Sequence, residues 1–457
     1  MNPVESFFWA FERDLDGAFR VLILVRLEGC IEGEFLRAAL RRLQIRHPKL
    51  RARLSRSGQF RYELPSDIAP IPFAITDYEG VEFPWRDQAL KLLQTALPAE
   101  GPFARVHVLR SRSRNYCELL FSAPHAIADG RSTIAIAGDL LAEYAAVESG
   151  AEAAAAEPLP PVSVVRVRVP GSTRDRLRLV ERFQGLRKTE ALVPLMPLPT
   201  AQGVSPQSQW MHWVFSPKET LAIVRRCRKE KVSLGSALMA AVFCALMECL
   251  PAPRVSFKWQ FPFDVRESLH GPAGPVTPHD LGCFMSNMNG LSAITRPYDV
   301  WEVARHAQGE IQLFSDLGGP AFSYRLASRL YTFRAVLGLF FRSFRRARTS
   351  SGPRETLLAT NYGVLGMRDS YGSLRPRECT LLFKKEITGP SLVVESLVLA
   401  QRLNVGFFAG DLDSGFWERV HPAVHAQLTA IMRDGGPSYS PNHEGLEGQR
   451  TSVAPHE

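Results

Sequence analysis

The chain has 457 residues, of which 45% are hydrophobic, so it can bury one large core or two medium ones and is long enough for two domains. This composition excludes an intrinsically disordered protein. The 55 basic residues exceed the 46 acidic ones and give a formal charge of +9. That charge fits a merely soluble basic surface as well as an anionic partner such as coenzyme A, an acidic carrier protein, anionic lipid or nucleic acid.

The seven cysteines are odd in number and form no CxxC pair, which indicates neither a disulfide framework nor a zinc site. The first residues lack a basic region followed by an apolar core, and no uninterrupted run of about 18 apolar residues occurs. We therefore expect a cytoplasmic protein with reduced, mostly buried cysteines.

The first half reads as strands followed by helices. Residues 21–25 are a continuous apolar strand, and Leu36, Leu40 and Leu43 have the spacing of a helix that Pro48 ends. Residues 104–110 and 116–123 are predicted to pair as strands. The second of them leads into the run PHAIADG and then a helix over residues 132–144. We assign residues 1–160 to this N-terminal half.

The run from Pro124 to Gly130 carries the chemistry of this half. His125 can titrate near neutral pH and take a proton from a hydroxyl or amine; alternatively, it is a neutral histidine hydrogen-bonded inside a turn. Asp129 can form an ion pair that shapes the loop, or cap the next helix, a task that Ser132 could share. Gly130 allows a ligand to pass close to the backbone.

The composition changes to Ala, Glu, Gly and Pro at residues 147–161, and residues 161–210 are expected to form a crossover between halves. Ser216 and Glu219 predict a capping box at the start of a helix. The C-terminal half is assigned to 211–433 and the rest, 434–457, to a disordered tail. Its remaining predicted elements are an apolar helix at 234–250, a strand at 255–265 that ends at Arg266, strands at 380–387 and 392–408, and a helix at 416–432.

Residues 333–348 form a basic amphipathic stretch, in which Phe and Leu alternate with Arg. Such a stretch is typical of a core-facing helix with a solvated basic side. The alternative is contact with an anionic surface, either a membrane or a carrier protein.

These residues together resemble a known family. The segments LRAALRRLQIRHPKLRARL (Leu36 to Leu54) and HAIADGRSTIAIAGDLLAEY (His125 to Tyr144) are similar to the opening of the condensation-domain superfamily of acyltransferases, with its HHxxxDG motif. The segments FPFDVRESL, DLGCFMSN and ATNYGVLG, which begin at Phe261, Asp280 and Ala359, resemble later landmarks in the same order. The chain resembles most the free-standing members, namely polyketide-associated acyltransferases and alcohol O-acetyltransferases.

The resemblance implies an α/β fold of two chloramphenicol-acetyltransferase-like halves, each a mixed sheet with flanking helices, which form a pseudo-dimer with a tunnel between them. It implies that His125 is the general base and that Asp129 is structural and pairs with Arg266. Gly130 would keep the passage open for a phosphopantetheine arm. The chain departs from the motif at its first histidine, where Pro124 stands.

Residues of the ATNYGVLG segment are candidates for substrate binding. Thr360 and Asn361 could donate hydrogen bonds near the thioester oxygen or the acceptor, because an oxyanion needs donors that the motif itself does not provide. Gly363 would close the turn beside them. The alternative is an ordinary strand followed by a turn.

We therefore expect an acyltransferase that moves an acyl group from acyl-CoA or an acyl-carrier protein to a hydroxyl or amine of a small-molecule or lipid acceptor. It would act as a monomer without a bound cofactor or metal, since no HExxH pattern occurs, and no GxSxG pattern points to a hydrolase. A catalytically silent carrier-binding or scaffold protein is the alternative, and the Pro124 departure supports it. Nucleic-acid binding rests on charge alone.

Overall fold

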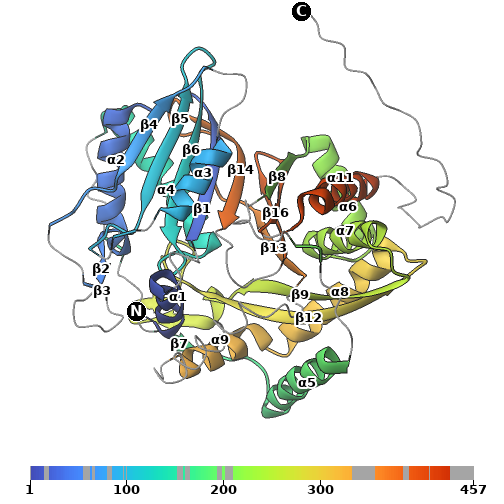
Figure 1. Cartoon of the computed structure of the whole chain (residues 1–457). Helices are drawn as coiled ribbons and strands as arrows, with labels where there is room; N and C mark the ends of the chain where they lie inside the picture. Colours follow the sequence, from blue (N-terminus) through green and yellow to red (C-terminus); the bar gives the residue numbers. More distant parts are fainter. Residues whose placement is uncertain are drawn as a thin grey trace, which may run out of the picture.

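The computed structural model describes residues 2–14, 20–54, 62–63, 67–79, 85–95, 97–98, 100–151, 158–159, 165–192, 198–200, 209–331, 356–383, 391–410 and 412–432. These residues form two α/β lobes that pack against each other (Figure 1). The amphipathic stretch at 333–348 and the tail at 434–457 lie outside the described residues. The crossover predicted at 161–210 is mostly described, and it is not an irregular linker, because it contains the 20-residue helix α5 (Thr173–Leu192).

The N-terminal lobe contains a five-stranded sheet in the order β14-β1-β6-β5-β4. Alternate residues of β1 pack on opposite faces, with Val21, Ile23 and Val25 in the core beneath α2 and α4, and Leu22 and Leu24 facing α3. The elements are β1 (Arg20–Glu28), α2 (Gly33–Arg46), β4 (Phe73–Asp77), α3 (Trp85–Gln94), β5 (Arg105–Ser111), β6 (Tyr116–Pro124), α4 (Gly130–Glu148) and β14 (Arg375–Phe383).

The C-terminal lobe contains a six-stranded sheet in the order β12-β9-β13-β15-β16-β8. Its largest core forms around α7, which is buried almost all round and contacts α8, α11 and β13. The elements are β8 (Gln209–Val214), α6 (Pro217–Lys229), α7 (Leu234–Cys249), β9 (Arg254–Asp264), β12 (Met285–Thr295), α8 (Val300–Asp316), β13 (Leu357–Val364), β15 (Leu392–Leu399), β16 (Arg402–Ala409) and α11 (Ser414–Ala430).

Smaller elements connect and cover the two lobes. Among them, α1 contacts both β6 and α9, so it bridges the lobes (Figure 1). They are α1 (Pro3–Asp14), the 3₁₀ helices Pro48–Arg51 and Arg266–Ser268, β2 (Arg53–Leu54), β3 (Tyr62–Glu63), β7 (Arg166–Val167), α5 (Thr173–Leu192), β10 (Leu269–Gly271), β11 (Gly274–Pro275) and α9 (Gly319–Leu330).

The lobes exchange a strand. β14 follows β13 of the C-terminal sheet in sequence, yet it pairs antiparallel with β1 of the N-terminal sheet. The predicted division of the chain at residue 211 therefore does not separate the two sheets completely. Leu382 of β14 packs in a shared interlobe core with Trp210, Val393 and Phe408 of the C-terminal sheet, so this strand ties the lobes together.

Several local predictions agree with the structure. The capping box is present, because the Ser216 hydroxyl accepts from the Glu219 N–H and the Glu219 carboxylate accepts from the Ser216 N–H. The strand predicted at 392–408 is wrong, because Ala400 and Gln401 adopt positive φ and turn the chain between β15 and β16. None of the seven cysteines is in a disulfide.

Candidate active site

The motif loop connects β6 to α4 between the two lobes. β6 ends at Pro124, whose carbonyl accepts from the Ile127 N–H at 3.0 Å and thereby closes a tight turn. Asp129 is the N-cap of α4, and its side chain accepts from the Ser132 N–H at 2.8 Å. The chain thus places the His125 side chain in the turn and the Asp129 side chain at the start of the helix.

The expected ion pair between Asp129 and Arg266 is present. Arg266, which follows β9 of the C-terminal lobe, donates from Nη2 to Asp129 Oδ1 at 2.9 Å and to the Ser132 hydroxyl at 2.8 Å. Asp129 Oδ2 accepts from the Phe284 N–H at 2.9 Å. Capping and ion pairing therefore occur together, and this pair joins the two lobes at the motif.

The electrostatics of the pair favour both charges. Burial alone would raise the pKa of Asp129, but the adjacent Arg266 guanidinium and the N–H donors lower it below its ordinary value. Burial opposes the charge of Arg266 too, yet the carboxylates of Asp129 and Asp264 raise the pKa of Arg266. The guanidinium also lies over the Phe284 ring, 4.9 Å from its centroid.

His125 lies beside this pair and is 8% exposed. Its ring stacks on Phe8 of α1, with centroids 4.5 Å apart and an interplanar angle of 13°. Nδ1 lies 3.6 Å from the Cys283 sulfur, and the ring also hydrogen-bonds to its own backbone. Within one histidine residue, only Nδ1 is close enough to the backbone to form such a bond. The contact with Cys283 and the contact with the backbone are therefore both on the Nδ1 side of the ring. No hydrogen bond engages Nε2 among the residues that the structure describes.

Burial lowers the pKa of His125, and the nearby Asp129 carboxylate and the backbone oppose this shift only in part. The imidazole is therefore neutral at pH 7. With the proton on Nδ1, the lone pair resides on Nε2, which is the tautomer that a general base requires.

Gly130 has a different surrounding from the one expected. A Cβ at this position would lie 2.2 Å from the Tyr362 hydroxyl, so the Tyr362 ring occupies the room that was expected to be an open passage. A side chain at this position would force the Tyr362 ring to move, so glycine lets that ring pack against the motif loop. Burial raises the pKa of Tyr362, and a hydrogen bond with Thr360 opposes the rise.

The structure separates the three residues predicted on β13. Adjacent residues of a strand point to opposite faces, and Leu358 belongs to the interlobe core whereas Ala359 belongs to the core around α7. Thr360 consequently lies on the interlobe side, together with Tyr362, and Asn361 lies near Gly235 of α7. Gly363 has φ of +69°, and its N–H donates to Asn361 Oδ1 at 2.9 Å.

Sequence reasoning missed three residues at this site, namely Phe8, Cys283 and Glu395. Glu395 of β15 neighbours Thr360 in the sheet and is 0% exposed. Its Oε1 accepts from the Thr380 hydroxyl at 2.6 Å and from the Leu381 N–H at 3.1 Å. Only the Cys283 segment carried a signal, since it lies within the landmark DLGCFMSN; Phe8 and Glu395 had none.

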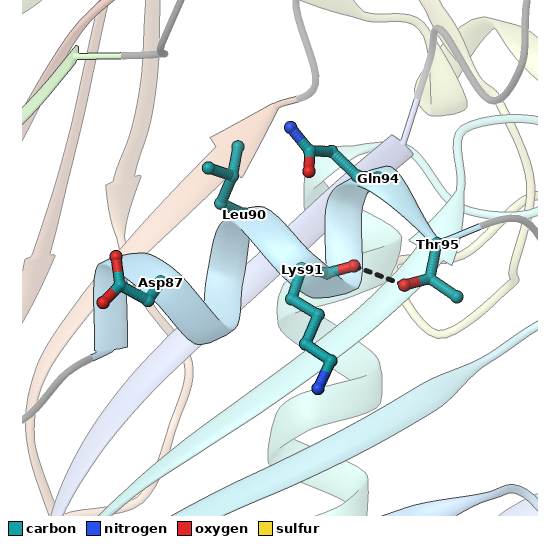
Figure 2. A pocket seen from close by; sticks show the side chains of 5 residues that line it. All are labelled: Asp87, Leu90, Lys91, Gln94 and Thr95. Carbon is teal, nitrogen blue, oxygen red and sulfur yellow. Dashed lines mark hydrogen bonds between the residues drawn. The ribbon is translucent and has the colours of Figure 1, made fainter.

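Other parts of the surface lie apart from this site. An open pocket of about 300 Å³ lies on α3. Figure 2 shows the five residues that line it, Asp87, Leu90, Lys91, Gln94 and Thr95, and none of the predicted site residues is among them. In the described ranges, no cluster of three or more His, Cys, Asp or Glu side chains could hold a metal ion. Among the described helices, none is by itself long and apolar enough to span a bilayer. α6 and α7 taken together meet the length and composition criteria, but they are bent by 95° relative to each other.

Comparison with known proteins identifies proteins that are similar to this chain. No protein-family model matches the chain. "Probable alcohol acetyltransferase crmB" of Aspergillus fumigatus is 25% identical over 346 residues, which cover 71% of each chain.

Two solved structures share the architecture. Polyketide synthase associated protein 5 from Mycobacterium tuberculosis has a TM-score of 0.62 at 19% identity and covers 94% of this chain and 97% of its own. The starter condensation domain of rhizomide synthetase, solved in complex with C8-CoA, has a TM-score of 0.60 at 14% identity, with 96% and 95% covered. The resemblance found in the sequence is thereby confirmed, and the chain has the two-lobed fold of the condensation-domain superfamily.

Proposed function

We propose that this protein transfers an acyl group from a thioester to a hydroxyl or amine acceptor, with His125 as the general base. The observation that carries the proposal is a neutral imidazole held between the lobes with Nε2 free of hydrogen bonds among the described residues. The similarity to a protein named as a probable alcohol acetyltransferase favours an alcohol acceptor.

In the proposed reaction, Nε2 of His125 takes the proton of the acceptor hydroxyl as its oxygen attacks the thioester carbonyl. The tetrahedral intermediate then collapses and breaks the C–S bond. The leaving thiolate takes the proton back from the imidazolium, so that an ester and a free thiol result. No acyl-enzyme forms, and the enzyme ends in its starting protonation state.

Thr360 and Tyr362 are the proposed donors to the developing oxyanion. Both lie on the interlobe side of β13, and the Tyr362 hydroxyl adjoins Gly130 of the motif loop. Burial keeps the Tyr362 phenol protonated, because it raises the pKa of that group, and a protonated phenol can donate a hydrogen bond. Asn361 and Gly363 would support this segment through their mutual hydrogen bond.

The proposed donor is acyl-CoA or an acyl group on a phosphopantetheinyl carrier protein, and the acceptor is a small natural product or a lipid. Both act as substrates, so no resident cofactor is needed. Because Tyr362 fills the space beside Gly130, a pantetheine arm that approached there would have to displace the phenol. We place this activity in cytoplasmic secondary-metabolite or lipid biosynthesis.

The test is a His125→Ala variant of the purified full chain, assayed with a panel of acyl-CoA donors and alcohols. Thiol release and mass spectrometry of the product would measure turnover. We expect kcat/KM to fall by about 10²–10⁴-fold, since general base catalysis contributes that much. The matched control is His270→Ala, which removes an exposed histidine and should leave turnover unchanged. Equal turnover by the His125→Ala variant and the wild type would refute the proposal.

A catalytically silent, carrier-binding protein is the second candidate. The observations that favour it are Pro124 in place of the first motif histidine and the phenol that fills the space at Gly130. It predicts that the wild-type protein binds a pantetheinylated carrier but releases no thiol with any donor in the panel.

A further inference from the structure

The surface formed by α5 and α9 combines exposed apolar and basic side chains. Seven large hydrophobic residues are exposed in the described part of the chain, and four of them lie on these two helices, namely Leu177, Val180, Leu326 and Leu330. α5 and α9 contact each other and run along the lower edge of the C-terminal lobe (Figure 1). Two neighbouring helices that share most of the exposed large hydrophobic residues are a candidate interaction surface.

Both helices carry a net positive charge. α5 carries six basic and three acidic residues, and α9 carries two basic and no acidic ones.

Some of the basic side chains of this surface lack a close carboxylate partner, although Arg182 of α5 pairs with Glu310 at 2.7 Å. Arg174, Arg325 and Arg329 form no ion pair with any of the described residues, and Arg178 only approaches Asp175 at 4.0 Å. Arg174, Leu177 and Arg178 recur at the spacing of one helical face. The surface therefore presents a positive potential beside apolar side chains.

We propose that the α5–α9 surface binds an anionic lipid bilayer. Arginines would contact the phosphate and carboxylate groups of the lipids, and the leucines would enter the boundary between headgroups and acyl chains. Nucleic acid would match the charge but offers little apolar surface to the four exposed large hydrophobic side chains.

This surface ends next to the candidate site. Tyr331, the first residue after α9, stacks on Phe7 with ring centroids 4.2 Å apart, and the adjacent Phe8 stacks on His125. A bilayer bound at α5 and α9 would therefore lie close to α1, on the side where a lipid acceptor could be delivered. The binding itself does not depend on the proposed catalysis.

The experiment is co-sedimentation of the full chain with vesicles of phosphatidylcholine alone or mixed with phosphatidylglycerol. We expect binding to the anionic vesicles only, with weaker binding at high salt. Arg174→Glu combined with Arg178→Glu should weaken partitioning by about tenfold or more. Leu326→Ser combined with Leu330→Ser should also weaken it, without changing the net charge.

The matched control is Arg225→Glu combined with Arg228→Glu on α6. These two arginines are exposed and lie three residues apart near the exposed Leu221. Their substitution changes the net charge of the protein by the same amount as the substitutions on α5. α6 contacts β16, whereas α9 contacts β12 at the opposite edge of the sheet. The control should bind vesicles as the wild type does, and circular dichroism should confirm that all variants are folded.

Three outcomes would overturn the proposal: no binding of the wild type to anionic vesicles, equal loss of binding in the α5 and α6 variants, or full binding by the α5 variant. If the wild type ignores vesicles but binds an acidic acyl-carrier protein through Arg174 and Arg178, the surface is a carrier-docking site instead.

Discussion

His125 is neutral and buried, and an aromatic ring covers one of its faces. The Phe8 ring stacks on it nearly parallel, so the face of the phenyl group lies against the imidazole. When His125 accepts a proton, the negative face of the phenyl ring attracts the positive charge. Phe8 would thereby favour the imidazolium that forms during the proposed reaction, although it transfers no proton itself.

The pH dependence of the rate tests this arrangement. Because burial lowers the pKa of His125, kcat/KM should fall on acidification with a midpoint below the ordinary histidine value of about 6.5. Phe8→Leu should lower kcat/KM by about twofold to thirtyfold, since a cation–π contact is worth about 0.5–2 kcal/mol, and should shift the midpoint to still lower pH.

Phe7→Leu is the matched control, because Phe7 stacks on Tyr331 and not on His125. It should leave the midpoint of the wild type unchanged. A midpoint above 6.5 in the wild type, or equal shifts in both variants, would contradict this role of Phe8.

At the scale of elements, α4 begins at the ion pair that joins the lobes. Asp129 caps the helix, pairs with Arg266 and accepts from the Phe284 N–H. The chain just before Phe284 is held too. Lys49 donates a hydrogen bond to the Leu281 carbonyl and another to Glu5 of α1, each at 2.6 Å. The start of α4 is thus held directly by Arg266 and Phe284 of the C-terminal lobe.

Removal of the Asp129 carboxylate should destabilise the protein strongly. Asp129→Ala leaves the buried Arg266 with Asp264 as its remaining carboxylate partner, and the loss of one partner of a buried ion pair costs up to about 3–5 kcal/mol. Asp299→Ala is the comparison, because Asp299 caps α8 by accepting from the Trp301 and Glu302 N–H groups. It removes a cap alone, which costs about 1 kcal/mol.

Urea unfolding of both variants, monitored by circular dichroism, measures the two free energies. Equal losses would mean that the ion pair contributes nothing beyond capping.

At the scale of the whole molecule, β14 and the polar groups around it hold the lobes in register. Arg26 of β1 pairs with Glu118 at 2.9 Å and with Glu378 of β14 at 2.6 Å, and it lies 3.4 Å from His212 of the C-terminal sheet. Burial and the adjacent Arg26 lower the pKa of His212 to about 3. Glu395 faces β14 from the other sheet, and burial raises its pKa to about 8.

Glu395 makes the stability of the folded chain depend on pH. Its carboxyl group holds its proton more tightly when folded than when unfolded, so the free energy of unfolding should fall as pH rises from about 4.5 to about 8. Each pH unit in this window costs at most about 1.4 kcal/mol. Glu395→Gln removes the ionisation, so its stability relative to the wild type should increase across the window.

Urea unfolding at pH 5 and pH 8.5 measures this difference. Glu34→Gln, at an exposed position of α2, is the control and should change little at either pH. A Glu395→Gln effect of the same size at both pH values would show that the carboxyl group is not responsible.

The local sequence determined what depends on neighbours in the chain. The β6–loop–α4 unit, the helix stop at Pro48 and the capping box at Ser216 follow from patterns within a few residues. The ordered motifs indicated the two-lobed fold and the pairing of Asp129 with Arg266, both of which the structure contains. The roles assigned to His125, Thr360, Asn361 and Gly363 stay predictions.

Only the tertiary structure decided which distant side chains share the site. Phe8 on His125, the Tyr362 phenol against Gly130, and β14 in the opposite sheet each join segments more than 100 residues apart. The burial of apolar surface that stabilises such contacts is non-directional. The sequence of either segment therefore contains no pattern that identifies its partner. The opposite orientations of Thr360 and Asn361 follow from strand pleating, but packing of β13 between α7 and the other lobe decided which of the two faces the site.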